Sequence, residues 1–412
     1  MVFNLAILIF PLFLSNSISV LAEVQKDYPE MAKFDEVMKM LMQYSNVPGA
    51  QLAVAKGGQL KYSKAFGVAN KESGELVRTD NIMRYNRISK VITGTAIAKL
   101  VQEGKLSLND KPFRLLQHLE PPKGDTADSR LLNITVQNLL QHSGGWNVSL
   151  TGINIVSEPA TLYAAQALDR PSPPSPEDAI RFMKALPLDF EPGSAMEYSN
   201  FGYIVLGRVI EHVTGVAYGR YVEENILGPL GIRGIKLGHT QVNRRAEKEV
   251  MYYGRNGEDT LWVSIFPGEG FVNASYGLLD YSSLDSVGGW IGSAGGIVRF
   301  VDHIDGLRQP AILQEDMVYT MLNAERPGKK RSKGLFVGVR VDRDGKIQSF
   351  QHSGAAPGAH SHFVRLTKEN ITWAYLLNTW PLQDEFVNIA AGNLSEVARS
   401  IQNWPDYDLT AV

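Results

Sequence analysis

The chain has 412 residues, of which 44% are hydrophobic and 20% are charged, and its formal net charge is −2. This composition can bury a large core, which excludes a disordered chain, and the near-neutral charge argues against electrostatic binding of nucleic acid. The sequence has no cysteine, so disulfides, thiolate nucleophiles and cysteine-ligated metals are excluded. The eight histidines include no His-Glu-x-x-His spacing, and we therefore predict neither a metal nor a cofactor.

The first apolar segment predicts a secretory signal peptide. Residues Leu5 to Leu14 are almost wholly apolar, and Val20-Leu21-Ala22 has the small or apolar residues of a cleavage site, so residues 1–22 would be removed after Ala22. The alternative is an uncleaved membrane anchor, but the run is too short to span a bilayer comfortably. No later apolar run has the length of a membrane span, so residues 23–412 are expected to be secreted and soluble, without a membrane partner.

The next segments predict a helix followed by a hairpin. Residues Pro29 to Tyr44 repeat apolar side chains at helical spacing. Residues Ala50 to Ala55 and Gln59 to Phe66 alternate on either side of Gly57-Gly58, which is typical of two strands joined by a tight turn.

The middle of the chain predicts helices with recognisable ends. Gly104 and Gly215 follow two apolar-periodic stretches, as expected of helix C-termini. Ser175-Pro176-Glu177-Asp178 supplies a cap, a first-turn proline and two acids before a third stretch. The predicted helices are Ile88 to Val101, Ala179 to Leu186 and Asn200 to Val213.

Strands reappear near the end and are followed by a closing helix, Phe386 to Ile401. Because strands at both ends enclose a helical middle, we predict the α/β class. The antiparallel sheet would come from both chain ends (about 23–80 and 285–412), flanked by helices, with an inserted, mostly helical region at about 81–284. The predicted C-terminal strands are Leu335 to Val341, Ile347 to His352, His360 to Leu366 and Ile371 to Asn378.

Five N-glycosylation sequons favour a eukaryotic secretory route, since composition alone would give about two. Chance is the alternative explanation for the excess. The sequon asparagines are Asn133, Asn147, Asn273, Asn370 and Asn393.

Several separated segments together resemble the serine β-lactamase and penicillin-binding protein superfamily, and most closely the class C β-lactamase, D-Ala-D-Ala carboxypeptidase and esterase branch. The resemblance covers roughly residues 30 to 400, and it implies a β-lactamase/transpeptidase-like domain over 23–412. The family chemistry is acyl transfer through a serine at a helix N-terminus. The segments are Met-Arg-Tyr-Asn-Arg-Ile-Ser-Lys at 83–90, Leu-Leu-Gln-His-Ser-Gly-Gly at 139–145, Glu-Pro-Gly at 191–193, Tyr-Ser-Asn at 198–200, Ser-Ala-Gly-Gly at 293–296 and His-Ser-Gly at 352–354.

The resemblance assigns roles position by position. Lys90 matches the motif lysine that activates the nucleophile, and Tyr198 and Asn200 match the second motif. His352-Ser353-Gly354 matches the third motif, which orients substrate. The backbone amides of residue 87 and Ala355 would stabilise the oxyanion.

The nucleophile does not match. Three residues before Lys90 stands Arg87 instead of serine, and no other Ser-x-x-Lys occurs in the chain. Ser89 is an unfavourable alternative, because it lies about 200° around the helix from position 87. A guanidinium stays protonated and has no lone pair to donate. Without the serine, about 10³–10⁴-fold of catalysis over the reaction in water would remain.

For several other residues, a structural role is an alternative to a functional role. Tyr198 and Asn200 could only cap a helix, and His142 is expected to be structural. His360 and His362 share a strand face and could bind a metal, but an ordinary pair is favoured without a third ligand. The basic segment Arg326 to Lys333 is expected to be a solvated loop, with an anionic partner as the alternative.

Two functions follow from these residues. We favour a catalytically impaired, non-enzymatic secreted protein that binds a small acyl or peptide ligand or serves in an extracellular matrix. The alternative is an active secreted serine hydrolase of β-lactamase, D-Ala peptidase or esterase type, with a non-standard nucleophile. Arg87 favours the first function, and the matching Lys90, Tyr198 and Asn200 favour the second.

Overall fold

The computed structural model describes residues 29–157, 159–329, 332–381 and 385–411. The predicted signal peptide lies outside these residues. In the described chain no helix has the length and apolar character needed to cross a bilayer.

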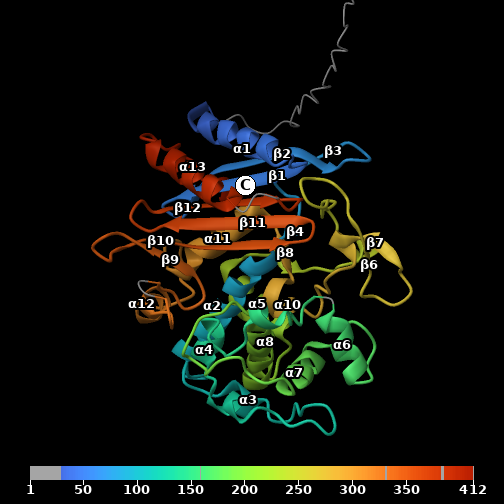
Figure 1. Ribbon diagram of the computed structural model, residues 1–412. Coiled ribbons are helices and arrows are strands. Elements are labelled where there is room, and N and C mark those ends of the chain that lie inside the picture. The colour runs from blue at the N-terminus through green and yellow to red at the C-terminus, as the bar shows by residue number, and fades with distance from the viewer. Residues whose placement is uncertain (1–28, 158, 330–331, 382–384, 412) are drawn as a thin grey trace, which may run out of the picture.

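The centre of the molecule is a seven-stranded antiparallel sheet in the order β3-β2-β1-β12-β11-β10-β9, whose longer strands run across Figure 1. Three strands come from near the N-terminus and four from near the C-terminus, so the predicted sheet from both chain ends is confirmed, and β3 is a strand that was not predicted. The strands are β1 (Gly49–Lys56), β2 (Gln59–Asn70), β3 (Glu75–Leu76), β9 (Gly338–Val341), β10 (Ile347–Ala356), β11 (Ala359–Leu366) and β12 (Ile371–Leu377).

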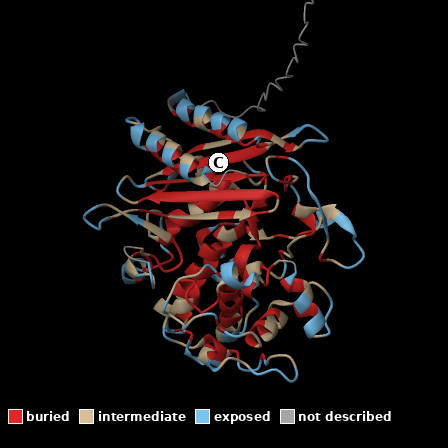
Figure 2. Cartoon of the chain, viewed as in Figure 1, coloured by how far each residue is buried: buried red, intermediate tan, exposed pale blue. Residues whose placement is uncertain are grey.

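Helices cover both faces of this sheet. The terminal helices α1 (Ala32–Tyr44) and α13 (Phe386–Ser400) lie side by side on one face (Figure 1), and α11 (Ala294–Ile304) packs on the other. Alternate residues of β1 serve the two faces: Leu52 and Val54 join the cluster under α1 and α13, whereas Ala53 and Ala55 join the main core. The sheet is therefore buried on both sides, as Figure 2 shows.

The inserted region is built around two long, buried helices, α2 (Ser89–Gln102) and α8 (Phe201–Thr214). Gly104 and Gly215 follow them with φ angles of 69°, so the predicted C-terminal signals are confirmed. Shorter helices surround this pair: α3 (Pro112–Leu115), α4 (Val136–Leu140), α5 (Val148–Thr151), α6 (Ala160–Ala167), α7 (Pro176–Lys184), α9 (Tyr218–Val222), α10 (Asp285–Gly288) and α12 (Glu315–Asn323).

Two small sheets accompany these helices, so the insertion is less uniformly helical than predicted. One sheet has the order β4-β8-β5 and joins the start of α2 to the segment before α11, and the other is a hairpin at the surface. The strands are β4 (Met83–Arg84), β5 (Lys236–Leu237), β6 (Leu261–Val263), β7 (Phe271–Asn273) and β8 (Trp290–Gly292).

Three predicted strand boundaries are wrong by three or four residues, and one of them is the end of β2, which was expected at Phe66 and lies at Asn70. The strand expected at Leu335 to Val341 begins only at Gly338, because residues 335–337 are buried in the core away from the sheet and the Leu335 amide bonds to the carbonyl of Met321. The strand expected to end at His352 continues to Ala356. The chain then reverses at Pro357-Gly358, where Gly358 has a φ of 84°, as a type II turn requires.

Candidate active site

Lys90 is the centre of a buried polar network at the start of α2. The residue is fully buried, and its Nζ donates to Tyr198 Oη at 2.7 Å and to Asn200 Oδ1 at 2.8 Å. The Tyr198 hydroxyl also bonds to Asn200 Oδ1 at 3.2 Å. The structure therefore brings together three residues that are up to 110 positions apart in the sequence and that the resemblance assigned to one site.

Asn200 lies at the N-terminus of a helix, but its side chain does not form the hydrogen bond of a helix cap. It is the N-cap residue of α8, yet its side chain makes no capping hydrogen bond. It accepts from Lys90 instead, and its Nδ2 donates to Asn154 Oδ1 at 3.2 Å. The simple capping explanation for Asn200 is therefore wrong, because the side chain points away from the helix end that it would cap.

The His142 ring packs against the Tyr198 ring. Its ring lies 4.6 Å from the Tyr198 ring, centre to centre, and its Nδ1 contacts the backbone carbonyl of Ser199 at 3.0 Å. The residue is buried and has a φ of 57°, a strained backbone state for a residue other than glycine. We infer that this strained corner fixes the ring that in turn positions Tyr198.

The third motif lies on β10, against the segment that precedes α2. That segment is the short 3₁₀ turn η2 (Asn86–Ile88). A Cβ at Gly354 would lie 2.5 Å from the carbonyl oxygen of Tyr85 and 2.7 Å from the amide nitrogen of Arg87, so only glycine allows this approach. The approach places the amide of residue 87 beside the segment that contains Ala355, where the two oxyanion donors were predicted.

The surroundings of the site shift the pKa values of its ionisable groups. Burial, and secondarily the charge of Arg87, hold the pKa of Lys90 well below its ordinary value. Burial, with the charges of Lys90, Arg326 and Arg87, lowers the pKa of His352 to about 3. Desolvation of its hydroxyl in the network raises the pKa of Tyr198, although 41% of the residue is exposed, and Arg87 opposes that rise. At neutral pH, therefore, the His352 ring is neutral, and the Lys90 amine releases its proton more easily than an ordinary lysine, which favours the form that can accept a proton.

Arg87 occupies the position of the serine whose hydroxyl proton the lysine accepts in the resembled family. It is half-buried in η2, three residues before Lys90, and it lines a cavity of about 30 Å³ together with Asn200 and Ala356. Small-molecule sites are typically about 300–1,000 Å³. A substrate therefore finds a guanidinium and little room at the start of α2.

Ser89 is not a substitute nucleophile in this geometry. Its side chain is fully buried, and its Oγ accepts the backbone amide of Trp290 at 3.2 Å. It faces β8 and the core, whereas Lys90 faces Tyr198. The sequence expectation that Ser89 points away from the site agrees with these contacts.

The basic segment at 326–333 requires a correction. Arg326 was expected in a solvated loop, but it is half-buried and donates to the carbonyls of Gly334 and Val337 at 3.0 Å and 2.7 Å. Its charge acts on His352 and His142. Lys329 is exposed as expected, and Lys330 and Arg331 lie outside the described residues.

Other residues that shape the site had little sequence signal. Asn154 comes from an irregular segment after α5 and orients Asn200. Asn86, with a φ of 48°, accepts from Tyr281 at 2.7 Å and donates to the Ala359 carbonyl at 3.0 Å. Arg84 lies fully buried against the Tyr281 ring. The only sequence signal for Asn86 and Arg84 was their position within the motif at residues 83–90.

His360 and His362 do share a face of β11, but it is the face under α13, where both are buried. His360 stacks on Tyr375 at 5.6 Å and meets Phe386 at 6.0 Å. In the described residues there is no group of three or more metal-ligating side chains. The two rings therefore act as aromatic packing in this structure.

The burial of His360 predicts a loss of stability in mild acid. Burial lowers its folded-state pKa to about 3, whereas an unfolded histidine has a pKa of about 6.5. Only the unfolded chain binds the proton between these values, so the stabilisation present above pH ~6.5 is lost as the pH falls toward ~3. From pH ~7 to ~5 this residue should remove about 2 kcal/mol of unfolding free energy.

Urea unfolding at both pH values measures this effect. His360→Phe keeps an aromatic ring in the stack and should flatten the dependence by that amount, while the same change at the exposed His118 should leave it unaltered. Equal pH dependence in the wild type and His360→Phe would contradict the assignment.

Comparisons with known proteins identify the family. A sequence profile described as Beta-lactamase matches residues 34–395. The chain is 27% identical over 246 residues to an Escherichia coli protein named as a candidate D-alanyl-D-alanine carboxypeptidase, covering 55% of this chain and 54% of that one. It is 30% identical over 203 residues to Esterase EstB of Burkholderia gladioli, covering 49% and 50%. The chain thus spans about half the length of the curated relatives it matches.

Solved structures show the same fold. The octameric penicillin-binding protein homologue from Pyrococcus abyssi has a TM-score of 0.64 at 24% identity, covering 89% of this chain and 77% of that one. A D-stereospecific amidohydrolase from Streptomyces has a TM-score of 0.66 at 22% identity, covering 88% and 98%. The predicted α/β fold class is confirmed. Since the profile spans most of the chain, from α1 to α13, the protein belongs to the Beta-lactamase family.

Proposed function

We propose that this protein is a secreted member of its family in which acyl-enzyme chemistry is disabled and the former catalytic cleft has a binding role. The observation that carries the proposal is Arg87. It occupies the position three residues before a buried, network-bonded lysine. An acyl-enzyme requires an oxygen or sulfur nucleophile at that place, and a guanidinium supplies neither.

Secretion is supported by the sequons. None of the five asparagines is buried: Asn133 and Asn370 are exposed, and Asn147, Asn273 and Asn393 are half-buried. Each side chain is therefore within reach of the surface, as glycan attachment requires. The partners of such a protein would be small acyl or peptide ligands or components of an extracellular matrix.

A second candidate is an active hydrolase with a non-standard nucleophile. The hydrogen bonds of Lys90 to Tyr198 and Asn200 favour it, because they form a complete proton-transfer set. The names of the relatives would then point to amide or ester substrates. The buried position of Ser89 weighs against this candidate.

Intact-protein mass spectrometry separates the two. Protein secreted from eukaryotic cells would be incubated with an acylating β-lactam and, separately, with a fluorophosphonate. We expect no adduct on the wild-type protein. A stoichiometric adduct mapped to one residue would establish the hydrolase instead. The same spectra, taken before and after peptide N-glycosidase, measure glycan occupancy, and an unchanged mass would count against the secretory assignment.

A further inference from the structure

We propose that the cleft beside Arg87 binds a short aliphatic carboxylate, with the Arg87 guanidinium as its main partner. The inference rests on the proposed function, because a ligand held there occupies the position of an attacking nucleophile. It goes further by naming the chemical class of the ligand.

The first argument is a set of cations without a counter-ion. In the described part of the chain, no ion pair includes Arg87, Lys90 or Arg326. All three nevertheless act electrostatically on His352. By contrast, the buried Arg208 bonds to Asp285 and Glu211, and Arg365 bonds to Asp305. Cations removed from water are normally paired. Lys90 is fully buried and Arg87 and Arg326 are half-buried, so the site lacks a negative charge that a ligand can supply.

The second argument is the chemistry of the groups around the cavity. Arg87 is the charged residue of its lining, and Val156, Leu279 and Val287 are apolar. The side-chain amides of Asn86 and Asn200 also line it but bond within the protein. A guanidinium binds a carboxylate through two parallel hydrogen bonds. The apolar side would cover a hydrocarbon group, which a bare inorganic anion lacks.

The third argument is size. The cavity of about 30 Å³ exceeds the roughly 10–15 Å³ that a single water molecule needs. It can hold a carboxylate head or a short alkyl group, whereas a drug-sized ligand needs at least about ten times more space. The ligand is therefore a short carboxylic acid, or the carboxylate end of a longer molecule whose remainder lies outside.

Calorimetric titration tests the proposal with matched pairs of ligands. Butyrate would be compared with butyramide, and N-acetylalanine, which mimics a peptide C-terminus, with its amide. We expect each carboxylate to bind at least about 10-fold more tightly than its neutral partner, since hydrogen bonds to a charged group are worth about 10- to 100-fold. Preference for butyrate over N-acetylalanine indicates a free short acid, and the reverse indicates a chain terminus.

Variants locate the effect. Arg87→Met keeps the length of the side chain and should lose the preference for carboxylate over amide, whereas Arg87→Lys should keep part of it. Arg233→Met removes an exposed arginine and should change nothing. Thermal unfolding of each variant verifies that it is folded.

Two outcomes would overturn the inference: no saturable binding of either carboxylate at tens of millimolar, or equal binding of carboxylate and amide. Either would leave the mass-spectrometric result intact, because that experiment monitors acylation only. An adduct on wild-type protein would defeat the proposed function whatever the titrations gave.

Discussion

Replacing Arg87 with serine is expected to increase acylation by a fluorophosphonate or an acylating β-lactam about 10³-fold or more over the wild-type protein. In serine hydrolases, loss of the nucleophile alone removes most of the rate enhancement, so its return should restore a comparable factor. The remaining parts are in place: Lys90 bonds to Tyr198 and Asn200, and the amide of residue 87 lies against Gly354. Time courses of intact mass measure the rate.

The pH dependence should identify Lys90 as the base. The amine must be neutral to accept the serine proton, so the acylation rate of Arg87→Ser should rise with pH through the pKa of Lys90. Burial keeps that pKa below the ordinary lysine value. Since Arg87 is the second cause of the lowering, its removal should place the midpoint higher than the pKa of Lys90 in the wild type.

Three controls make this result specific. Arg87→Ala removes the cation without adding a hydroxyl and should give no adduct. Arg87→Ser combined with Lys90→Met should lose the gain, whereas Arg87→Ser combined with Ser89→Ala should keep it. Adducts on Arg87→Ala at the rate of Arg87→Ser would show that another residue is the nucleophile and that Arg87 only blocked the cleft.

The architecture was predictable because its signals are local and repeated. Gly57-Gly58 supplies two positive φ angles, of 60° and 75°, to the turn between β1 and β2. The cap Ser175 accepts the amide of Asp178 at the start of α7. The motif that contains Lys90 lies at the N-terminus of α2, where the resemblance predicted a helix start. The roles of the site residues remain predictions.

The unpredicted parts depend on distant contacts. Residues 335–337 have the composition of a strand but are core packing, because Phe336 lies where a Cβ of Gly94 would be. Arg326 looked like part of a solvated basic run, but two carbonyls hold it near His352. Nothing in the local sequence of Asn154 indicates that it orients Asn200. Such contacts join segments whose proximity only the folded chain defines.

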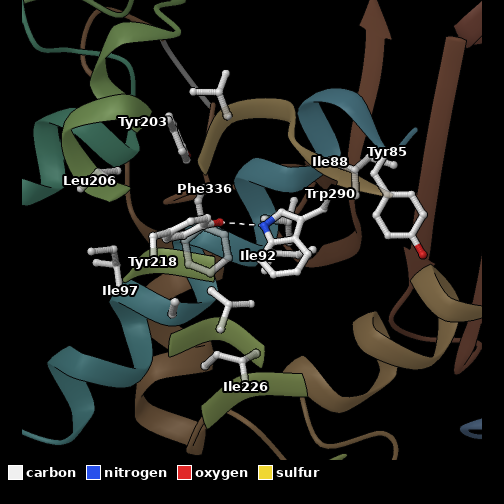
Figure 3. Packing of buried hydrophobic residues seen from close by; sticks show 14 of the residues in the cluster. Tyr85, Ile88, Ile92, Ile97, Tyr203, Leu206, Tyr218, Ile226, Trp290 and Phe336 are labelled. Carbon is white, nitrogen blue, oxygen red and sulfur yellow. Dashed lines mark hydrogen bonds between the residues drawn. The ribbon is translucent and has the colours of Figure 1, made fainter. Parts of the chain in front are cut away.

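Replacing Trp290 with alanine is expected to remove about 3–5 kcal/mol of unfolding free energy, the usual cost of truncating a buried tryptophan. Trp290 is fully buried on β8, and its Nε1 donates to Tyr218 Oη at 2.9 Å. Figure 3 shows it among Ile88, Ile92 and Phe336 in the main core. Urea unfolding at neutral pH measures the change.

The matched control is Trp262→Ala, which deletes the same side chain from the exposed hairpin of β6 and β7, where Trp262 is 47% exposed. This variant should lose less than about 1 kcal/mol. Trp290→Phe should fall between the two, since it keeps part of the ring volume, and Tyr218 Oη keeps its contact with Thr93 at 2.7 Å. A loss below about 1 kcal/mol in Trp290→Ala would contradict the packing shown in Figure 3.

The same substitution should also affect the site. The backbone of Trp290 accepts the amide of Tyr85 and donates to Ser89 Oγ, so β8 holds the turn that carries Arg87 from both sides. If the indole fixes β8, then Trp290→Ala in the Arg87→Ser background should slow acylation while Trp290→Phe preserves it. Equal acylation rates in these two variants would show that Trp290 supports the core without positioning the start of α2.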